Sequence, residues 1–380
     1  MRIAMVGTRG VPAHYGGFET AIEEIGRRLV EQGDEVTVYC RPTGATPPTN
    51  HLGMRLVNLP SLHSKSLETL SHTALSVVHL LARERPDVAI VFNAANAPFV
   101  PLLRLRGIPV AVHVDGLEWK RAKWGGAGRH YYRRAEAMAV RWADALIADA
   151  QGIADYYRDE FDAPTELLVY GAPLQPDPGH DRIADLGLSC RGYHLVVARF
   201  EPENHVAEIL EGYHRSGACQ PLVVVGSAPY ADAYTAQLTE IAAGDPRIRL
   251  VGGLWDQRQL DQLYAHCSTY LHGHSVGGTN PSLLRAMGAG APGVAFDVSF
   301  NREVLGPDGH FFRDPTDLPP LLEAAEQGPD AWAAKGGRLR TRAATRYQWS
   351  EVADGYSLLL KRLDAGESTR GAASGRRRAR

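Results

Sequence analysis

The chain has 380 residues and a formal net charge of −2, with 44% hydrophobic and 22% charged residues. This length suits two ordinary domains, and the composition is that of a soluble globular protein. The charge balance gives no sign of a nucleic-acid partner, and no apolar run approaches the roughly 20 residues that span a bilayer.

The N-terminal residues enter a strand at once, so we expect no signal peptide. Cys40, Cys190, Cys219 and Cys267 are scattered without the spacing of a metal site. We therefore expect no metal, reduced thiols and a cytoplasmic protein.

Short β-branched runs alternate with helical patterns along the first half of the chain. The expected strands are Ile3–Val6, Val36–Cys40, Arg55–Leu59, Val88–Phe92, Val110–Val114, Ala145–Ala148 and Leu167–Val169, with amphipathic helices such as Ala21–Glu31 and Leu67–Arg85 between them. This alternation predicts a doubly wound parallel α/β sheet with helices on both faces. We expect such a Rossmann-like domain over residues 1–172.

The composition shifts to Pro, Gly and Asp around Gly171–Asp185, which predicts a linker. The alternation then restarts, with strands expected at Leu195–Ala198, Leu222–Val225, Arg249–Val251, Ser268–Leu271 and Val294–Phe296. A second Rossmann-like domain is therefore predicted over residues 186–346, followed by a helix at about 349–364. Residues 365–380 are small, polar and basic, and we expect them to be disordered.

Residues 268–297 contain the strongest candidate site. A strand leads to glycines 273, 277 and 278, then to Thr279 or Asn280 as a helix cap with Pro281 at the first helical position. Free amides at a helix start, combined with the helix dipole, form an anion site. The polar groups His272, His274, Ser275, Thr279 and Asn280 favour a phosphate-bearing ligand over an ordinary crossover.

A second glycine-rich loop occupies residues 7–19. It lacks the Gly-x-Gly-x-x-Gly spacing of a dinucleotide site, and Arg41 stands at the end of the second strand where such a site has an acid. The loop can bring Arg9 and backbone amides against a sugar or phosphate. The alternative is a purely structural turn.

Polar and aromatic residues also follow two strand ends. Residues 113–124 hold carboxylates, cations and indoles that suit a sugar acceptor on an anionic carrier, the alternative being a solvated salt-bridged loop. Arg199 follows the first strand of the second domain and can pair with a diphosphate, the alternative being an ion pair with Glu201 or Glu203.

A basic amphipathic helix is expected after the first of these loops. The apolar stripe is predicted to be Tyr131, Ala135, Met138, Trp142 and Ala145, with Arg129, Arg133, Arg134 and Arg141 mostly outside it. This pattern fits an anionic membrane surface as well as it fits a core-facing helix with a solvated basic face.

Four runs carry a family resemblance: GTRGVPAHYGGFET, DGLEWKRAKW, EPENH, and HGHSVGGTNPSL followed by AMGAG. In this order they resemble glycosyltransferase family 4, retaining enzymes with the GT-B fold, and within it a subgroup that contains rhamnosyltransferases of polysaccharide assembly. The resemblance extends from Ile3 to about Leu363. It implies two Rossmann-like domains facing a central cleft, with a C-terminal helix at Trp349–Leu363 crossing back to the first.

The resemblance also implies residue roles. Arg199 occupies the position of the family's diphosphate-binding arginine, and Asn204 stands where the family usually has lysine. Gly277 and Arg285 occupy the ends of the family's Glu-x7-Glu pair, whose second glutamate accepts hydrogen bonds from donor hydroxyls. Because arginine has no acceptor, Arg285 either meets a phosphate or leaves nucleoside binding weakened. Asp115 stands where relatives carry a histidine near the anomeric centre, with His113 as a partial substitute.

These assignments give a predicted site in three parts. The donor is expected to contact Gly17, Arg199, Asn204, Gly226, Gly278, Thr279, Asn280, Pro281 and Arg285. The acceptor is expected to contact Arg9, Tyr15, Gly16, Glu19, Glu118, Trp119, Lys120, Arg121, Lys123 and Trp124. The predicted catalytic residues are His113, Asp115, Arg199 and His274.

The family's activity implies metal-independent, retaining transfer of a sugar from a nucleotide diphosphate sugar, a co-substrate, with no further cofactor. We expect TDP-rhamnose as the first donor, then UDP- or GDP-sugars, and a lipid-carrier-linked saccharide as acceptor. One alternative, motivated by Arg285 and Asn204, is a catalytically impaired sugar-nucleotide-binding or assembly protein. Another is an NAD(P)-dependent oxidoreductase, which the glycine spacing disfavours.

Overall fold

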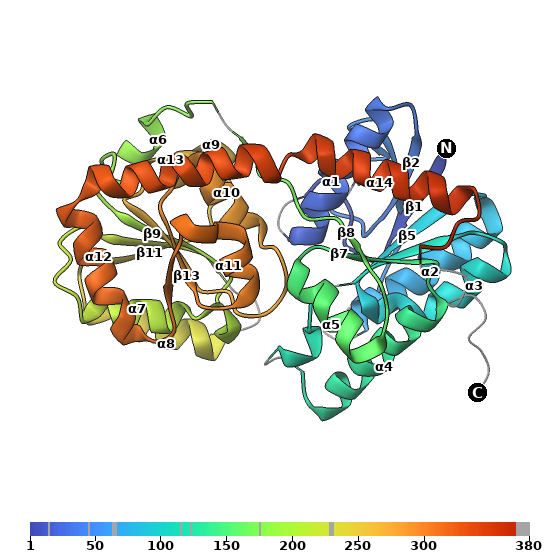
Figure 1. The fold of residues 1–380 in the computed structure, drawn as a ribbon, viewed down its shortest axis with the longest axis horizontal. Coiled ribbons are helices and arrows are strands. Elements are labelled where there is room, and N and C mark those ends of the chain that lie inside the picture. Colours follow the sequence, from blue (N-terminus) through green and yellow to red (C-terminus); the bar gives the residue numbers. More distant parts are fainter. Residues whose placement is uncertain are drawn as a thin grey trace. The chain divides into compact units, whose positions relative to one another are not determined.

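The computed structural model describes residues 1–13, 16–44, 46–62, 67–114, 116–121, 124–174, 176–227 and 232–369. The chain divides into two compact units, one formed by residues 1–170 and 349–380 and the other by residues 171–348. Each unit is built on its own largely or wholly parallel sheet (Figure 1).

Unit 1 contains a sheet in the order β3-β4-β2-β1-β5-β6-β7-β8. Its strands are β1 (Arg2–Val6), β2 (Glu35–Cys40), β3 (Asn50–His51), β4 (Met54–Asn58), β5 (Val88–Phe92), β6 (Val110–His113), β7 (Ala145–Ala148) and β8 (Glu166–Leu167). All neighbouring strands are parallel except the short β3–β4 pair. Strand β5 (VAIVF) is buried at every residue, as expected for a strand with both faces covered.

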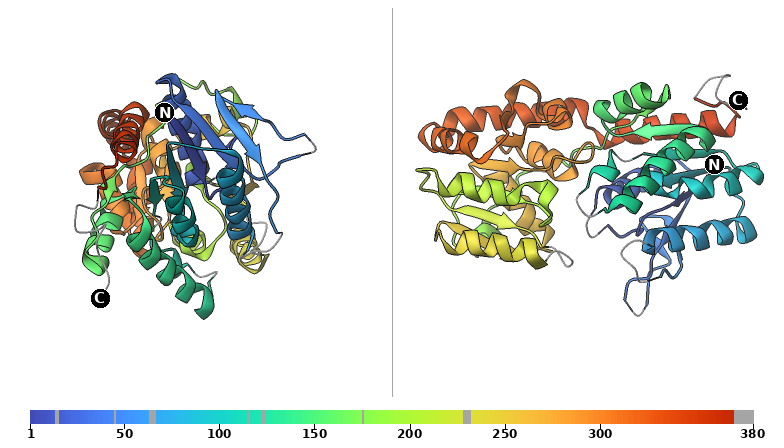
Figure 2. Two further views of the ribbon diagram at one scale, coloured as in Figure 1. Left: turned by 90° about the vertical axis from the view of Figure 1, so that its right-hand side faces the viewer. Right: turned by 90° about the horizontal axis from the view of Figure 1, so that it is seen from below.

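Helices cover both faces of this sheet. They are α1 (Gly17–Glu31), α2 (Glu68–Arg83), α3 (Val100–Leu105), α4 (Gly126–Trp142), α5 (Gln151–Phe161) and α14 (Trp349–Asp364), with 3₁₀ turns η1 (Ala94–Phe99) and η2 (Glu118–Lys120). The chain runs outward from β1 to β4 and then returns to continue from β5. Right-handed crossovers therefore place α1 on one face and α2, α3 and α4 on the other. Helix α14 packs against α1, whereas α3 packs against both α2 and α4 (Figure 2).

Unit 2 contains six parallel strands in the order β11-β10-β9-β12-β13-β14. Its strands are β9 (His194–Val197), β10 (Leu222–Val225), β11 (Ile248–Gly252), β12 (Thr269–His272), β13 (Gly293–Phe296) and β14 (His310–Phe312). In chain order this is the 3-2-1-4-5-6 arrangement of a doubly wound Rossmann fold. The predicted pair of doubly wound α/β domains is confirmed.

The helices of unit 2 are α6 (Asp181–Ala184), α7 (Val206–His214), α8 (Asp232–Ala243), α9 (Gln257–His266), α10 (Pro281–Ala289), α11 (Ser299–Leu305), α12 (Leu318–Gln327) and α13 (Pro329–Arg346), with turns η3 (Pro202–Asn204), η4 (Gly306–Asp308) and η5 (Pro315–Asp317). A core of apolar side chains such as Leu210, Val224, Leu238 and Leu322 joins α7, α8 and α12 to the sheet. Helix α10 packs against α9 and α13. The sheet is thus covered by two helical layers.

Candidate functional site

The switch point of unit 2 lies between β9 and β12, which are neighbours in the sheet although three helices separate them along the chain. The connections leaving these two strands run in opposite directions. Ligands of open α/β sheets bind beyond the carboxyl ends of the strands at such a point. The residues after Val197 and after His272 therefore form the first candidate site.

Arg199 follows β9, and its side chain is 52% exposed. The nearest carboxylate is that of Glu201, whose Oε1 lies 3.6 Å from Nη1, so the ion pair that the sequence offered as an alternative is present but loose. Asn204 is buried, and its Nδ2 donates to the carbonyl of Arg199 at 2.7 Å. The Asn204 amide therefore shapes the loop that presents Arg199, and the donor contact expected for Asn204 stays a prediction.

The loops after β9 and β12 are joined by short backbone contacts. A Cβ on Gly273 would lie 2.0 Å from the carbonyl oxygen of Asn204, so only glycine permits this approach. Ser275 donates its backbone N–H (3.0 Å) and its Oγ (3.1 Å) to the carbonyl of Glu203. The His205 ring stacks on Phe296 with 4.0 Å between centroids, and its Nε2 lies 2.9 Å from the Oγ of Ser275. The two loops are fixed to each other within the fold.

Two histidines stack at the end of β12, with the rings of His272 and His274 4.4 Å apart. His272 is buried, and burial lowers its pKa to about 3, so its imidazole is neutral near pH 7. His274 is only partly buried, and its carbonyl accepts a hydrogen bond from Nδ2 of Asn301 at 2.9 Å. The predicted catalytic His274 is thus held at the carboxyl edge of the sheet.

Helix α10 begins at the end of the loop that follows β12. Asn280 is its N-cap and Pro281 its first residue, as predicted. The Asn280 side chain accepts hydrogen bonds from the Ser282 N–H at 3.0 Å and the Ser282 Oγ at 2.7 Å. The preceding Gly277 has a φ of 122° that favours glycine, Gly278 follows it, and Thr279 is buried. The result is an ordered helix start whose dipole favours an anion.

Gly226 occupies the neighbouring end of β10. A Cβ there would lie 1.9 Å from the carbonyl oxygen of Ala198, so the turn depends on glycine. The N–H of Gly226 donates to the carbonyl of Gly252 at 2.9 Å, which brings the loop after β11 alongside. Trp255 in that loop is 71% exposed, and sequence reasoning missed it. The sequence feature that could have identified Trp255 is its position directly before Asp256, the N-cap of α9. An exposed indole in such a position can stack on a flat ring.

Arg285 is bound to α9. Its Nε and Nη2 each lie 2.8 Å from Oδ1 of Asp261, and the guanidinium lies 6.0 Å from the centroid of the Tyr264 ring. The side chain of Asp261 is 9% exposed, and a carboxylate with so little access to water needs a nearby cation. The guanidinium therefore joins α9 to α10, and the donor contact expected for Arg285 stays a prediction.

The second candidate site lies in unit 1, where β1 and β5 are neighbours and the chain again reverses direction. A Cβ on Gly7 would lie 2.3 Å from the carbonyl oxygen of Phe92. Gly16, with a φ of 112°, caps α1, which begins at Gly17. The Glu19 Oε1 accepts the Arg9 N–H at 3.1 Å, so this carboxylate orders the loop. The Arg9 side chain is exposed, and Tyr15 lies outside the described residues.

His113, one of the predicted catalytic residues, lies in the core of unit 1. The side chain is fully buried, with its ring 5.0 Å from that of Phe18, 5.4 Å from Phe92 and 6.0 Å from Tyr170. Burial lowers the pKa of His113 to about 3. The ring is a neutral core group that touches no solvent. The predicted catalytic Asp115 lies outside the described residues.

Glu118 forms the main polar contacts within the segment after β6. Glu118 is buried, and its Oε2 lies 2.5 Å from Nε of Arg121, while its Oε1 accepts a hydrogen bond from the indole Nε1–H of Trp124 at 3.4 Å. Two cations lie near the Trp119 ring centroid, Lys120 Nζ at 5.5 Å and the Arg133 guanidinium at 5.3 Å. Of these predicted acceptor residues Lys120 is the most exposed, and Lys123 lies outside the described residues.

Helix α4 turns a different stripe toward the core from the one predicted. Its buried residues are Tyr132, Ala135, Glu136 and Ala139, while Tyr131 is half-buried and donates its hydroxyl to the carbonyl of Ala95 at 2.7 Å. The predicted basic face is exposed at Arg129, Arg133, Arg134 and Arg141. The aromatic rings therefore point inward and the arginines outward.

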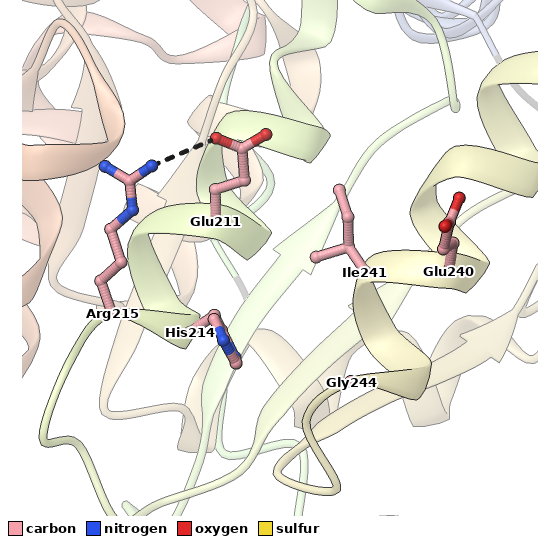
Figure 3. Close-up of a pocket in the computed structure, with 6 residues that line it drawn as sticks. All are labelled: Glu211, His214, Arg215, Glu240, Ile241 and Gly244. Carbon is pink, nitrogen blue, oxygen red and sulfur yellow. Dashed lines mark ion pairs between the residues drawn. The ribbon is translucent and has the colours of Figure 1, made fainter.

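Three further observations concern metal sites, membrane-spanning helices and a surface depression. In the described part of the chain, no three His, Cys, Asp or Glu side chains are grouped to hold a metal ion. None of the helices described combines the length and apolar character that crossing a bilayer demands. A depression of about 310 Å³ lies between the ends of α7 and α8, lined by Glu211, His214, Arg215, Glu240, Ile241 and Gly244 (Figure 3). It lies at the edge where the strands begin, opposite Arg199 and the start of α10.

Each of the two units matches a protein-family model. Residues 16–171 match the model of a glycosyl transferase 4-like domain, and residues 192–328 match that of the glycosyl transferases group 1. The chain belongs to the glycosyltransferases of the GT-B fold. Sucrose-phosphate synthase of Thermosynechococcus elongatus is similar to this GT-B chain over 96% of its length and 99% of the other's, with a TM-score of 0.83 and 18% identity.

Two further similarities concern ligands and activity. HepE of Anabaena, solved in complex with UDP-glucose, is similar over 95% of this GT-B chain and 99% of the other, with a TM-score of 0.77 and 14% identity. An O-antigen chain mannosyltransferase B of Escherichia coli is 26% identical over 182 residues, 45% of this chain. The match spans 47% of that protein, about half its length.

Proposed function

We propose that this GT-B chain transfers a sugar from a nucleoside diphosphate sugar to a saccharide on a lipid carrier, in the synthesis of a cell-surface polysaccharide. The observation that carries this proposal is the anion site at the switch point of unit 2. There the exposed Arg199 and the start of α10 converge on the carboxyl edge of the sheet, where ligands of this fold bind. The UDP-glucose bound by HepE supports a nucleoside diphosphate sugar as the donor. The similarity to the O-antigen chain mannosyltransferase supports a role in polysaccharide synthesis.

The proposed chemistry is metal-independent and retaining. A leaving diphosphate carries concentrated negative charge, which Arg199 and the amides at Gly278–Pro281 would stabilise as the bond to the sugar breaks. The acceptor hydroxyl would attack from the leaving-group face and pass its proton to a donor phosphate oxygen. No protein nucleophile is then required. His274 would line the sugar side of the anion site, because it lies in the loop that connects β12 to the start of α10.

The donor sugar is proposed to be rhamnose from TDP-rhamnose, on the rhamnosyltransferase-like runs of the sequence. The test is product formation from a panel of TDP-, UDP- and GDP-sugars with a lipid-linked glucose acceptor, with and without EDTA. Turnover with TDP-rhamnose that persists in EDTA supports the full proposal. Turnover with another donor alone would show that the donor sugar is not rhamnose. The absence of product with every donor would refute the proposed transferase activity.

The Arg285–Asp261 ion pair motivates a second candidate. The chain has no carboxylate at the position where its family binds donor hydroxyls, so it could bind sugar nucleotides without turning them over. Isothermal titration calorimetry separates the two candidates. Binding of a nucleotide sugar without product favours the binding protein, whereas any enzymatic turnover eliminates it.

A further inference from the structure

Two arginines contact one carboxylate at the carboxyl edge of the unit 2 sheet. Asp297 directly follows β13, and its side chain is only 7% exposed. Arg302 donates to both carboxylate oxygens, with Nη2 at 2.8 Å from Oδ2, and Nε of Arg313 lies 2.7 Å from the same Oδ2. The two guanidiniums hold the pKa of Asp297 below its usual value. Because one carboxylate meets two cations, the cluster carries an excess of positive charge.

Both guanidiniums of this Asp297 cluster remain accessible to a ligand. The side chain of Arg302 is 52% exposed and that of Arg313 is 75% exposed. Among the described residues, Nη1 of Arg302 and both Nη groups of Arg313 form no hydrogen bond. A guanidinium presents its N–H donors in a planar fork that matches phosphate geometry. The cluster can therefore bind an anionic group in addition to Asp297.

Contacts within the fold hold both arginines in place. The Arg302 guanidinium lies 4.5 Å from the centroid of the Phe311 ring, which restricts its movement. The backbone N–H of Arg313 donates to Oδ2 of Asp317 at 2.8 Å, so this second carboxylate orders the turn after β14. Since their positions are fixed before a ligand arrives, little conformational entropy is lost on binding.

The Asp297 cluster is linked to the proposed sugar side of the donor site. Asn301, directly before Arg302, is buried, and its Nδ2 donates to the carbonyls of His274 and Phe296, each at 2.9 Å. This amide joins the loop after β12, which contains His274, to α11 (Figure 1). The cluster and the first candidate site therefore share one edge of the same sheet.

The proposed reaction contains a second anion that needs a partner. The donor diphosphate is assigned to Arg199 and the start of α10. A saccharide joined to its carrier by a diphosphate brings another such group, one sugar ring away from the reacting hydroxyl when the saccharide is a single sugar. Two diphosphates this close repel each other, so the second requires cations of its own.

We propose that Arg302 and Arg313 bind the diphosphate that joins the acceptor saccharide to its carrier. The proposal rests on the proposed transferase function and names a residue pair that recognises the acceptor. The acceptor residues expected from the sequence all lie within residues 9–124, so the assignment of Arg302 and Arg313 is new. The charged linkage of the acceptor, and not only its sugar, would determine which molecules are accepted.

The experiment compares two acceptors that carry the same glucose. One is joined by a diphosphate to a short, water-soluble prenyl chain, and the other is a neutral alkyl glucoside. Arg302→Gln and Arg313→Gln should each raise the KM for the diphosphate acceptor roughly tenfold, because each removes charge-assisted hydrogen bonds. The KM for the neutral glucoside and the KM for the donor should stay unchanged. Each variant leaves one arginine on Asp297, so the carboxylate is still paired.

A matched control and a conservative variant complete the design. Arg338→Gln removes an arginine that is 54% exposed and pairs with a different carboxylate, Asp308, at 2.6 Å, and it should change neither KM. Arg302→Lys keeps the charge without the planar fork, so its KM for the diphosphate acceptor should lie between those of Arg302→Gln and the parent chain.

An unchanged KM for the diphosphate acceptor in both glutamine variants would overturn the proposal. An equal rise in KM for both acceptors would also overturn it, because that result indicates a purely structural role of the Asp297 cluster. If the parent chain forms product with neither acceptor and with no donor, the transferase function itself is refuted, and this assignment fails with it. Turnover by the parent chain therefore distinguishes the failure of one proposal from the failure of the other.

Discussion

Replacing Arg199 with alanine is the most direct test of the proposed donor site. The side chain is 52% exposed and makes one loose contact, 3.6 Å from Oε1 of Glu201. An exposed ion pair of this kind contributes about 0–1 kcal/mol to folding. The Arg199→Ala variant should therefore unfold at nearly the same temperature as the parent chain.

The effect on transfer should be much larger. If the guanidinium donates to the diphosphate, its loss removes charge-assisted hydrogen bonds, which contribute roughly 1.5–3 kcal/mol each. If such a hydrogen bond forms in the transition state, its loss lowers kcat/KM roughly 10- to 150-fold. Lysine keeps the charge but loses the planar fork, so Arg199→Lys should fall between alanine and the parent.

The assay is steady-state transfer at varied donor concentration, together with thermal unfolding. Arg215→Ala is the control, because Arg215 is 53% exposed and 3.8 Å from Glu211 at the other edge of the same sheet. We expect this control to keep full activity. A kcat/KM within twofold of the parent for folded Arg199→Ala would refute the donor role of Arg199.

Three further substitutions test other assignments. Arg285→Glu should lower the free energy of unfolding by about 1–3 kcal/mol, because it sets two carboxylates together, and adding Asp261→Asn should recover most of the loss in a denaturant titration. His113→Phe should keep transfer activity; a large loss would restore a chemical role for the imidazole. Because burial lowers the pKa of His113 to about 3, against about 6.5 unfolded, the folded state loses stability as the pH falls below about 6.5. At pH 5 the buried imidazole should lower the free energy of unfolding by about 2 kcal/mol relative to neutral pH, and His113→Phe should abolish this decrease. Denaturant titrations of the parent and the variant at neutral pH and at pH 5 measure the difference. Trp255→Ala should raise the KM for the donor several-fold with little change in unfolding temperature, and an unchanged KM would exclude stacking.

Much of the fold follows from local sequence pattern. The runs Val88–Phe92, Ala145–Ala148 and Leu222–Val225 predict β5, β7 and β10 with their observed bounds, because short apolar runs with both faces covered have few alternatives. The cap at Asn280 and the proline after it were equally predictable, since both depend on backbone chemistry within one turn. The edge strand β14 was missed, because three residues carry too little pattern.

Side-chain partners were harder to predict. The stripe of α4 was assigned to Tyr131, but the buried residue is Tyr132, because η1 offers a carbonyl for the Tyr131 hydroxyl. Nothing near Arg285 in sequence reveals Asp261, which lies on the preceding helix. His113 looks like a site residue from its place at a strand end, yet the surrounding aromatic rings come from four distant segments.

The return of α14 to unit 1 has a consequence for biosynthesis. Tyr356 and Leu360 of this helix are buried, and the helix packs on α1, so residues 1–170 lack part of their core until the final helix is made. Unit 2 is continuous from residue 171 to 348 and needs no later segment. On the ribosome, the second unit should therefore be able to complete its folding before the first, and unit 1 should be completed only after α14 has been made.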